Sequence, residues 1–191
     1  MYQPTFSQDW FSHNKPTWEK TITPYLKAID SPKILEVGVF EGRSSLWFLS
    51  NFPALVLTVI DPWAFTNDAS EDTYNRFKSN ISPFNDRVTV MRGTSQLMRT
   101  LQDKEYDVIY IDGEHTSSAV LHDAILAYEL VKIGGLLIFD DYQGGDKSLM
   151  YPKPAVDFFH EAYGALNKIE LVSDSYQRIY KKLAGVAPPQ F

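Results

Sequence analysis

The sequence of 191 residues contains no cysteine. This absence excludes disulfide frameworks, thiolate metal sites and cysteine nucleophiles. Long apolar runs are also absent: stretches such as residues 54–60 and 135–139 are too short to span a bilayer and instead predict buried strands. The first residues lack a charged region followed by an apolar run, the pattern of a secretion signal. We therefore expect a cytoplasmic protein with no membrane partner.

An excess of positive charge is also missing. The chain has 18 Lys and Arg against 24 Asp and Glu, a formal net charge of -6. Such a balance does not indicate the excess of Lys and Arg that binds the phosphate backbone of a nucleic acid. We therefore expect no nucleic-acid partner, while a homo-oligomer remains open.

Short apolar runs alternate with longer mixed segments along the chain. The predicted strands are residues 33–37, 55–60, 88–91, 108–111 and 136–139. The predicted helices are residues 17–29, 44–51, 70–81, 95–101, 117–131 and 154–166, with residues 132–135 as a helix stop. Runs that are apolar on both faces are typical of parallel strands between helices. The sequence predicts an α/β fold in a single domain, residues 1–191.

The carboxyl-terminal part predicts an antiparallel hairpin at the sheet edge. Residues 169–172 and 176–180 are its predicted strands, and residues 173–175 are its turn. The longest connection, residues 62–86, is rich in aromatic side chains. These rings either wall a ligand pocket or pin a helix to the sheet, and both readings stay open. The aromatic residues in question are Trp63, Phe65, Tyr74, Phe77 and Phe84.

A glycine-containing turn follows the first predicted strand. Gly38 permits a tight turn and close approach of a ligand, and Gly42 lets the next helix begin near the strand. Free N–H groups at that helix start suit an anionic ligand group. The second strand ends at Asp61, where a carboxylate can accept hydrogen bonds from ribose hydroxyls. Together these features favour a nucleoside-containing cofactor over an ordinary strand–helix turn.

Three acids follow the fourth and fifth predicted strands: Asp112, Asp140 and Asp141. Parallel strands bring such ends to one edge of a sheet, where the carboxylates repel one another unless a cation lies among them. Oxygen ligands suit Mg²⁺. The alternative is that these residues only form turns. His115 lies three residues after Asp112 and is a candidate base for a substrate at this site, or merely a helix-start residue.

In order and spacing, residues 34–142 resemble the class I S-adenosylmethionine-dependent methyltransferases. Within that class they are similar to metal-dependent O-methyltransferases of the catechol and macrolide-sugar types. The resemblance implies a Rossmann-like three-layer α/β/α sandwich with a mostly parallel sheet and a carboxyl-terminal antiparallel hairpin.

The resemblance also implies roles for individual residues. S-adenosylmethionine would be held by Glu36, Gly38, Phe40, Gly42, Ser44, Asp61, Ser95, Gln96 and Asp112. Asp112, Asp140 and Asp141 become ligands of Mg²⁺ or a similar divalent cation, and His115 becomes the base, as in sugar-modifying members. The chain lacks the Trp-Lys pair of catechol O-methyltransferase, which argues against a lysine base. Any lid over the substrate must come from residues 1–16 or 65–85.

The predicted function is therefore metal-assisted transfer of a methyl group to a hydroxyl oxygen of a small molecule or sugar. A metal-independent methyltransferase would keep the cofactor residues while the paired acids are structural. A nicotinamide-dependent oxidoreductase would show a Gly-x-Gly-x-x-Gly loop, which is absent here. A catalytically silent nucleoside-binding module is the remaining alternative.

Overall fold

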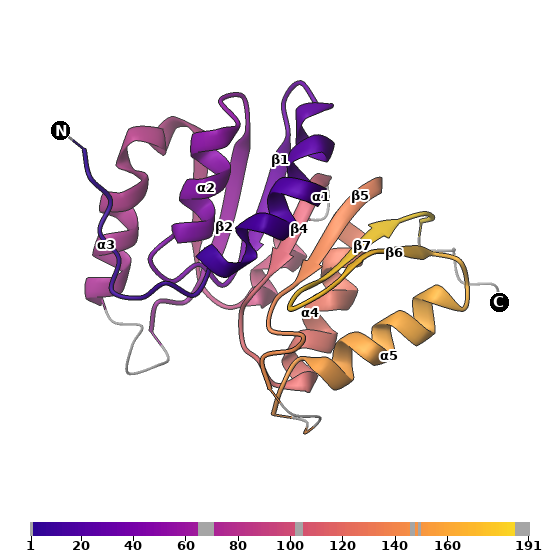
Figure 1. Cartoon of the computed structure of the whole chain (residues 1–191). Coiled ribbons are helices and arrows are strands. Elements are labelled where there is room, and N and C mark those ends of the chain that lie inside the picture. Colours follow the sequence, from indigo (N-terminus) through magenta and orange to yellow (C-terminus); the bar gives the residue numbers. More distant parts are fainter. Residues whose placement is uncertain (1, 65–70, 102–104, 146–147, 149, 186–191) are drawn as a thin grey trace. The chain divides into compact units, whose positions relative to one another are not determined.

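The structure is a computed structural model, which describes residues 2–64, 71–101, 105–145, 148 and 150–185. Its contacts group the chain into two compact units, Met1–Leu97 and Met98–Phe191, and each is described by itself. Figure 1 labels their helices and strands. Among the helices of the described residues, none has both the length and the apolar character that crossing a bilayer requires.

The first unit holds three parallel strands in the order β3-β2-β1. Its elements are η1 (Ser12–Asn14), α1 (Lys15–Lys27), β1 (Lys33–Val37), α2 (Arg43–Asn51), β2 (Val56–Asp61), α3 (Glu71–Ile81), η2 (Ser82–Arg87) and β3 (Val88–Arg92). The register pairs Lys33 with Val56 and Leu57 with Val88. After their first residues, β1 and β2 are buried throughout, as expected for strands covered on both faces.

Strand β3 departs from that expectation. It ends the strand order of the first unit, and its residues are exposed or half-buried. The run was predicted to be buried because its residues are apolar, but a strand with one neighbour in its unit has fewer contacts to cover it.

Helix α1 packs on α2 through aromatic rings. Trp18, Ile22 and Leu26 recur every four residues on one face of α1 and are fully buried. The Trp18 ring lies 4.7 Å from Phe48 and 5.1 Å from Trp47. This packing fixes α2, and with it the turn that leads into α2.

The second unit holds β4 (Tyr106–Ile111), α4 (Ser117–Leu130), β5 (Val131–Phe139), α5 (Lys153–Gly164), β6 (Ile169–Asp174) and β7 (Arg178–Lys182). Strands β4 and β5 are parallel, and β7 pairs antiparallel with both β5 and β6. The β6–β7 hairpin, yellow in Figure 1, runs along β5. Helix α4 packs on β4 and β5, and α5 packs on α4 and β6. The predicted α/β class and terminal hairpin are confirmed.

Two further local predictions need correction. Helix α4 stops at Leu130 as expected, but residues 132–135 belong to β5 rather than to a connecting loop. The register of β4 against β5 shifts between Tyr106 and Val108, and a Cβ on Gly135 would lie 2.9 Å from the carbonyl oxygen of Asp107. The glycine therefore permits a close backbone approach within a strand. Residues 95–101 form a 3₁₀ helix, η3 (Ser95–Leu101), not an α-helix.

The terminal hairpin turns later than predicted. Strand β6 continues to Asp174 and β7 begins at Arg178, so residues 175–177 form the turn in place of residues 173–175. Arg178 donates from Nε to Asp174 Oδ1 at 3.0 Å, which holds the two strand ends together. The shift moves Tyr176 out of the predicted strand and into the turn.

Candidate functional site

The turn between β1 and α2 contains three residues with left-handed backbone. Gly38, Phe40 and Gly42 have φ values of 83°, 54° and 76°. Glycine adopts this region freely, but a phenylalanine is strained there. A Cβ on Gly42 would also lie 2.7 Å from Cδ2 of Phe77, so α3 packs against this glycine. Both the backbone and the packing therefore require glycine at position 42.

Asp61, at the end of β2, holds this turn through backbone hydrogen bonds. Its Oδ2 accepts the N–H groups of Val39 at 2.7 Å and Phe40 at 3.0 Å. Its Oδ1 accepts the N–H of Trp63 at 2.7 Å. The side chain predicted to bind ribose is thus first a support for the turn; binding of ribose by Asp61 stays a prediction.

Trp63 also stabilises this turn through a hydrogen bond. Its indole Nε1–H donates to the carbonyl oxygen of Phe40 at 2.8 Å. The fully buried indole also packs on α3, with ring centroids 4.8 Å from Tyr74 and 4.9 Å from Phe77. For these rings the helix-pinning interpretation is favoured. Phe65, which belonged to the same prediction, lies outside the described residues.

Glu36 and Ser44, both predicted to hold the cofactor, contact each other in the interior. The Ser44 hydroxyl donates to Glu36 Oε1, and the Ser45 hydroxyl donates to Oε2 at 2.5 Å. Burial, with a smaller contribution from the charge of Asp61, raises the pKa of Glu36 to about 7. These bonds fasten the first turn of α2 to β1. Of the two later cofactor candidates, Ser95 is half-buried and Gln96 is exposed in η3.

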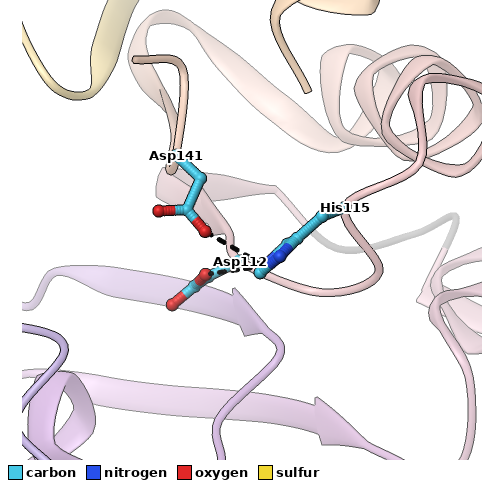
Figure 2. Close-up of side chains that lie close together, drawn as sticks. All are labelled: Asp112, His115 and Asp141. Carbon is cyan, nitrogen blue, oxygen red and sulfur yellow. Dashed lines mark ion pairs between the residues drawn. The ribbon is translucent and has the colours of Figure 1, made fainter. Parts of the chain in front are cut away.

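In the second unit, Asp112, His115 and Asp141 converge (Figure 2). His115 Nε2 lies 3.3 Å from Asp141 Oδ2 and 3.7 Å from Asp112 Oδ1. Asp112 follows β4, Asp141 follows β5 and has a φ of 52°, and His115 precedes α4. One ligand atom from each residue lies within 4.8 Å of the others. The structure thus brings together two of the three predicted metal ligands and the predicted base.

Asp140 lies deeper than the other two predicted ligands. Its Oδ1 accepts the N–H of Asp141 at 2.8 Å, and its Oδ2 accepts the Tyr110 hydroxyl. The same hydroxyl lies 3.0 Å from Asp112 Oδ2. Asp140 is buried and is joined to the cluster through the Tyr110 hydroxyl. Among the described residues, its carboxylate does not belong to the group of three possible metal ligands.

Tyr110 and Tyr176 are site residues that the sequence reasoning missed. The Tyr176 hydroxyl donates to Asp141 Oδ1 at 2.5 Å from the hairpin turn. Tyr110 of β4 precedes Asp112 by two residues, so the alternation of side chains, continued one residue past the end of β4, predicts that both lie on the same face. That signal was available from the sequence. No such signal pointed to Tyr176, because its position depends on the register of a hairpin that lies more than 30 residues after Asp141 in the sequence.

Negative charge dominates the electrostatics of this cluster. Burial and the charge of Asp140 raise the pKa of Asp112 well above its ordinary range, and burial raises the pKa of Asp140. The neighbouring carboxylate of Asp112, together with the charges of Asp141 and Asp140, raises the pKa of His115. A cation among these groups would relieve the repulsion.

The donor set fits a divalent cation. Mg²⁺ ligands lie at about 2.1 Å, which puts adjacent octahedral ligands about 3.0 Å apart. The grouped oxygens of Asp112 and Asp141 lie within 4.8 Å of each other, so a small side-chain movement would let both contact one ion. Mg²⁺ prefers oxygen to imidazole, so Asp112 and Asp141 are its natural holders. His115 is then left with a free ring nitrogen for a proton.

Comparison with known proteins places these residues in a family. Residues 35–142 match the family described as a methyltransferase domain, which is more than half of the 191 residues. The chain belongs to this methyltransferase family. The match spans the glycine turn, Asp61 and the Asp112–His115–Asp141 cluster. It confirms the membership of the S-adenosylmethionine-dependent methyltransferases that the sequence motifs predicted.

Two relatives extend this result. The chain is 25% identical over 178 residues to the caffeoyl-CoA O-methyltransferase of Stellaria longipes, covering 88% of this chain and 70% of that protein. It is 31% identical over 118 residues to an uncharacterized protein of Acanthamoeba polyphaga mimivirus, covering 60% of this chain. The chain spans about half the length, 53%, of that viral protein.

Among solved structures, the MycE methyltransferase of the mycinamycin biosynthetic pathway, in complex with Mg and SAH, is similar with a TM-score of 0.67. Its sequence is 14% identical, and the similarity covers 98% of this chain and 56% of that one. At this identity the likeness concerns the fold. It confirms the Rossmann-like methyltransferase fold that the sequence predicted.

The buried carboxylate of Glu36 predicts a measurable effect of pH on stability. Its pKa rises from 4.5 to about 7 on folding, so the folded chain keeps a proton that the unfolded chain releases in this range. The stabilisation is complete below about pH 4.5 and is lost as the pH rises through 7. At 1.36 kcal/mol per unit, the loss is about 3 kcal/mol. Glu36→Gln cannot titrate, so urea denaturation should show wild type losing about this much relative to the variant across the range.

Glu71→Gln is the matched control, since Glu71 is an exposed carboxylate of the same unit paired with Arg92. It should leave the pH dependence between 4.5 and 7 as in wild type. Parallel stability curves for wild type and Glu36→Gln would show that Glu36 is ionised in the folded chain throughout.

Proposed function

We propose that this chain transfers a methyl group from S-adenosylmethionine to a hydroxyl oxygen of a small molecule, with a divalent cation held by Asp112 and Asp141. The observation that carries the proposal is the convergence of Asp112, His115 and Asp141 within residues matched by the methyltransferase family. A methyltransferase that acts on a hydroxyl must hold the cofactor, ionise the oxygen and orient it. The chain offers residues for each of these tasks.

For the cofactor, the turn from Gly38 to Gly42 and Asp61 are the proposed holders. The backbone of this turn is fixed by Asp61 and Trp63, so little ordering remains to be done when a ligand binds. Ser95 and Gln96 are the proposed contacts nearer the adenine, as the family resemblance implies. The hydrogen bond between Glu36 of β1 and Ser44 of α2 joins the two elements that flank the turn and so stabilises it.

For the hydroxyl, a divalent cation on Asp112 and Asp141 would lower the pKa of the acceptor and fix its direction. The MycE structure in complex with Mg and SAH supports such a cation in a protein of this fold. Tyr110 and Tyr176 orient the two carboxylates by hydrogen bonds, which is how outer residues commonly fix ligand geometry. Asp140 adds negative charge behind them.

For the proton, His115 is the proposed base. Its Nε2 faces both carboxylates, and nearly half of its side chain, 49%, is exposed. An imidazole reached by solvent can pass the proton on after accepting it. We expect a small-molecule acceptor with adjacent hydroxyls, such as a catechol or a sugar diol, because its two oxygens would fill two neighbouring positions of the cation and water the others.

A metal-independent methyltransferase is the second candidate. The contacts of His115 with Asp112 and Asp141 favour it, since a carboxylate that orients an imidazole can produce a base without any cation. Both candidates use the same cofactor turn. They differ in whether the acids bind a metal.

Substitution of Asp141 tests the proposed metal site. Asp141→Asn keeps an oxygen at the site but removes one negative charge, so Mg²⁺ binding should weaken by about tenfold or more. Calorimetric titration of the chain with Mg²⁺ measures this directly. Glu161→Gln is the control, because Glu161 is an exposed acid on α5 of the same unit. Equal Mg²⁺ affinity in the two variants would rule out Asp141 as a ligand and favour the metal-independent candidate.

The pKa of His115 provides a second test. Without a cation the neighbouring carboxylates raise the pKa of His115, which favours the protonated ring over the neutral form that can accept a proton. Mg²⁺ on Asp112 and Asp141 should lower it by withdrawing their charge. NMR titration of the His115 ring with and without Mg²⁺ measures the change. His122, which lies 3.5 Å from Asp123 on α4, is the internal control and should not respond.

Turnover should follow the same ring. With catechol as the acceptor, the rate should rise with pH through the pKa of His115, and His115→Ala should lose about a hundredfold. His122→Ala should keep the wild-type profile. An unchanged pH profile in His115→Ala would leave the cation as the sole activator of the hydroxyl.

A further inference from the structure

The amino-terminal segment, residues 2–11, lies against the turn from Gly38 to Gly42, the proposed cofactor turn. We call this segment the strap. It has no helix or strand, and in Figure 1 it runs past α3 and beneath α2 before α1 begins. It precedes the family match, which begins at residue 35. The strap is therefore a feature that the shared methyltransferase motifs do not explain.

Asn80 of α3 holds the strap by bonds that resemble pairing with another strand. Its Oδ1 accepts the N–H of Thr5 and its Nδ2 donates to the Thr5 carbonyl oxygen, both at 2.8 Å. The same Nδ2 lies 3.0 Å from the carbonyl oxygen of Glu41 in the turn. The Asn80 side chain is 1% exposed, so its bond to Glu41 is buried, while its two bonds to Thr5 are partly buried. One side chain thus joins the strap, α3 and the turn.

Glu41 makes the second junction, from within the turn itself. Its Oε2 accepts the N–H of Ser7 at 2.6 Å, and its Oε1 accepts the Ser7 hydroxyl at 2.7 Å. Arg76 of α3 pairs with the same carboxylate. Glu41 is only 2% exposed, and a buried charge is tolerated when it is paired and hydrogen-bonded. Removal of the strap would leave this carboxylate with fewer partners.

The neighbours of Glu41 contact the strap as well. The Trp10 ring packs 4.7 Å from that of Phe40, the residue with a strained left-handed backbone. The Arg43 guanidinium lies 4.1 Å above the Phe6 ring and donates to the carbonyl oxygen of Gln8 at 3.2 Å. The strap therefore covers Phe40, Glu41 and Arg43 together. A strained turn persists only where its surroundings hold it.

We propose that Glu41 is a positioning residue that fastens the strap to the turn and so keeps the turn in its cofactor-binding conformation. The inference rests on the proposed role of the turn in binding S-adenosylmethionine. Coupling of this kind is reciprocal: if the closed strap favours the cofactor, then the cofactor favours the closed strap by the same factor. Loss of the Glu41 contacts weakens both.

Two measurements test the coupling, with S-adenosylhomocysteine as the probe. Calorimetry should give an affinity about tenfold lower in Glu41→Ala and a smaller loss in Ser7→Ala, which removes one hydroxyl bond. Ser7→Thr keeps the hydroxyl and should restore binding. Hydrogen exchange at the Thr5 and Ser7 amides, whose acceptors are Asn80 and Glu41, should slow about tenfold with the probe in wild type and much less in Glu41→Ala.

Glu71→Gln, an exposed acid on the first turn of α3, is the control and should bind as wild type. A purely structural role would lower the melting temperature of Glu41→Ala while leaving the affinity of the folded chain and the probe-dependent exchange unchanged, and that result overturns the proposal. Ser7→Ala keeps the test valid if Glu41→Ala does not fold. Failure of wild type to bind the probe overturns the cofactor assignment itself, and the inference with it.

Discussion

The structure of both units depends on one constraint, which comes from the carboxylates at the ends of parallel strands. Each one must find hydrogen-bond donors or a cation, because an ionised group removed from water is costly to leave unpaired. In the first unit the donors are present within the chain. Asp61 accepts three backbone N–H groups, Glu36 accepts two serine hydroxyls, and Glu41 pairs with Arg76 and Ser7. These bonds shape the turn from Gly38 to Gly42, which we propose binds the cofactor.

The second unit meets the same constraint with fewer donors. Three carboxylates share the hydroxyls of Tyr110 and Tyr176, one backbone N–H, the Gln177 side chain and the His115 ring. Burial, together with the charges of the neighbouring carboxylates, raises the pKa of Asp112 and of Asp140. The contrast with the first unit supports our proposal that a cation is part of this cluster. The two units thus carry different parts of one proposed chemistry.

The sequence predicts the arrangement of the strands well because buried parallel strands have a strong local pattern. β1 matches its predicted bounds, and α2 and α4 differ by one residue at one end. The failures have tertiary causes. Gly135 reads as a helix stop but permits a close approach between β4 and β5, and β3 is apolar in sequence yet poorly covered. Such outcomes depend on neighbours that no short window contains.

The site was predictable to the same degree. Asp112, His115 and Asp141 could be found because they follow strands that had been recognised, whereas the deeper position of Asp140 depends on Tyr110. Asp61 was expected to face a ribose, but three backbone N–H groups already occupy its oxygens, so supporting the turn is its first role. No role was predicted for Glu41, because from the sequence alone it is only a residue between the two glycines of the turn. Its partner Ser7 lies 34 residues away, and only folding brings them together.

The identity of the cofactor is the central claim. Calorimetric titration of the chain with S-adenosylhomocysteine, and separately with NADH, tests it directly. We predict that the adenosyl compound binds more tightly, and that Asp61→Ala lowers its affinity by about tenfold to a hundredfold through lost support of the turn and lost hydrogen bonds. Tighter binding of NADH, or an unchanged affinity in Asp61→Ala, would contradict the account.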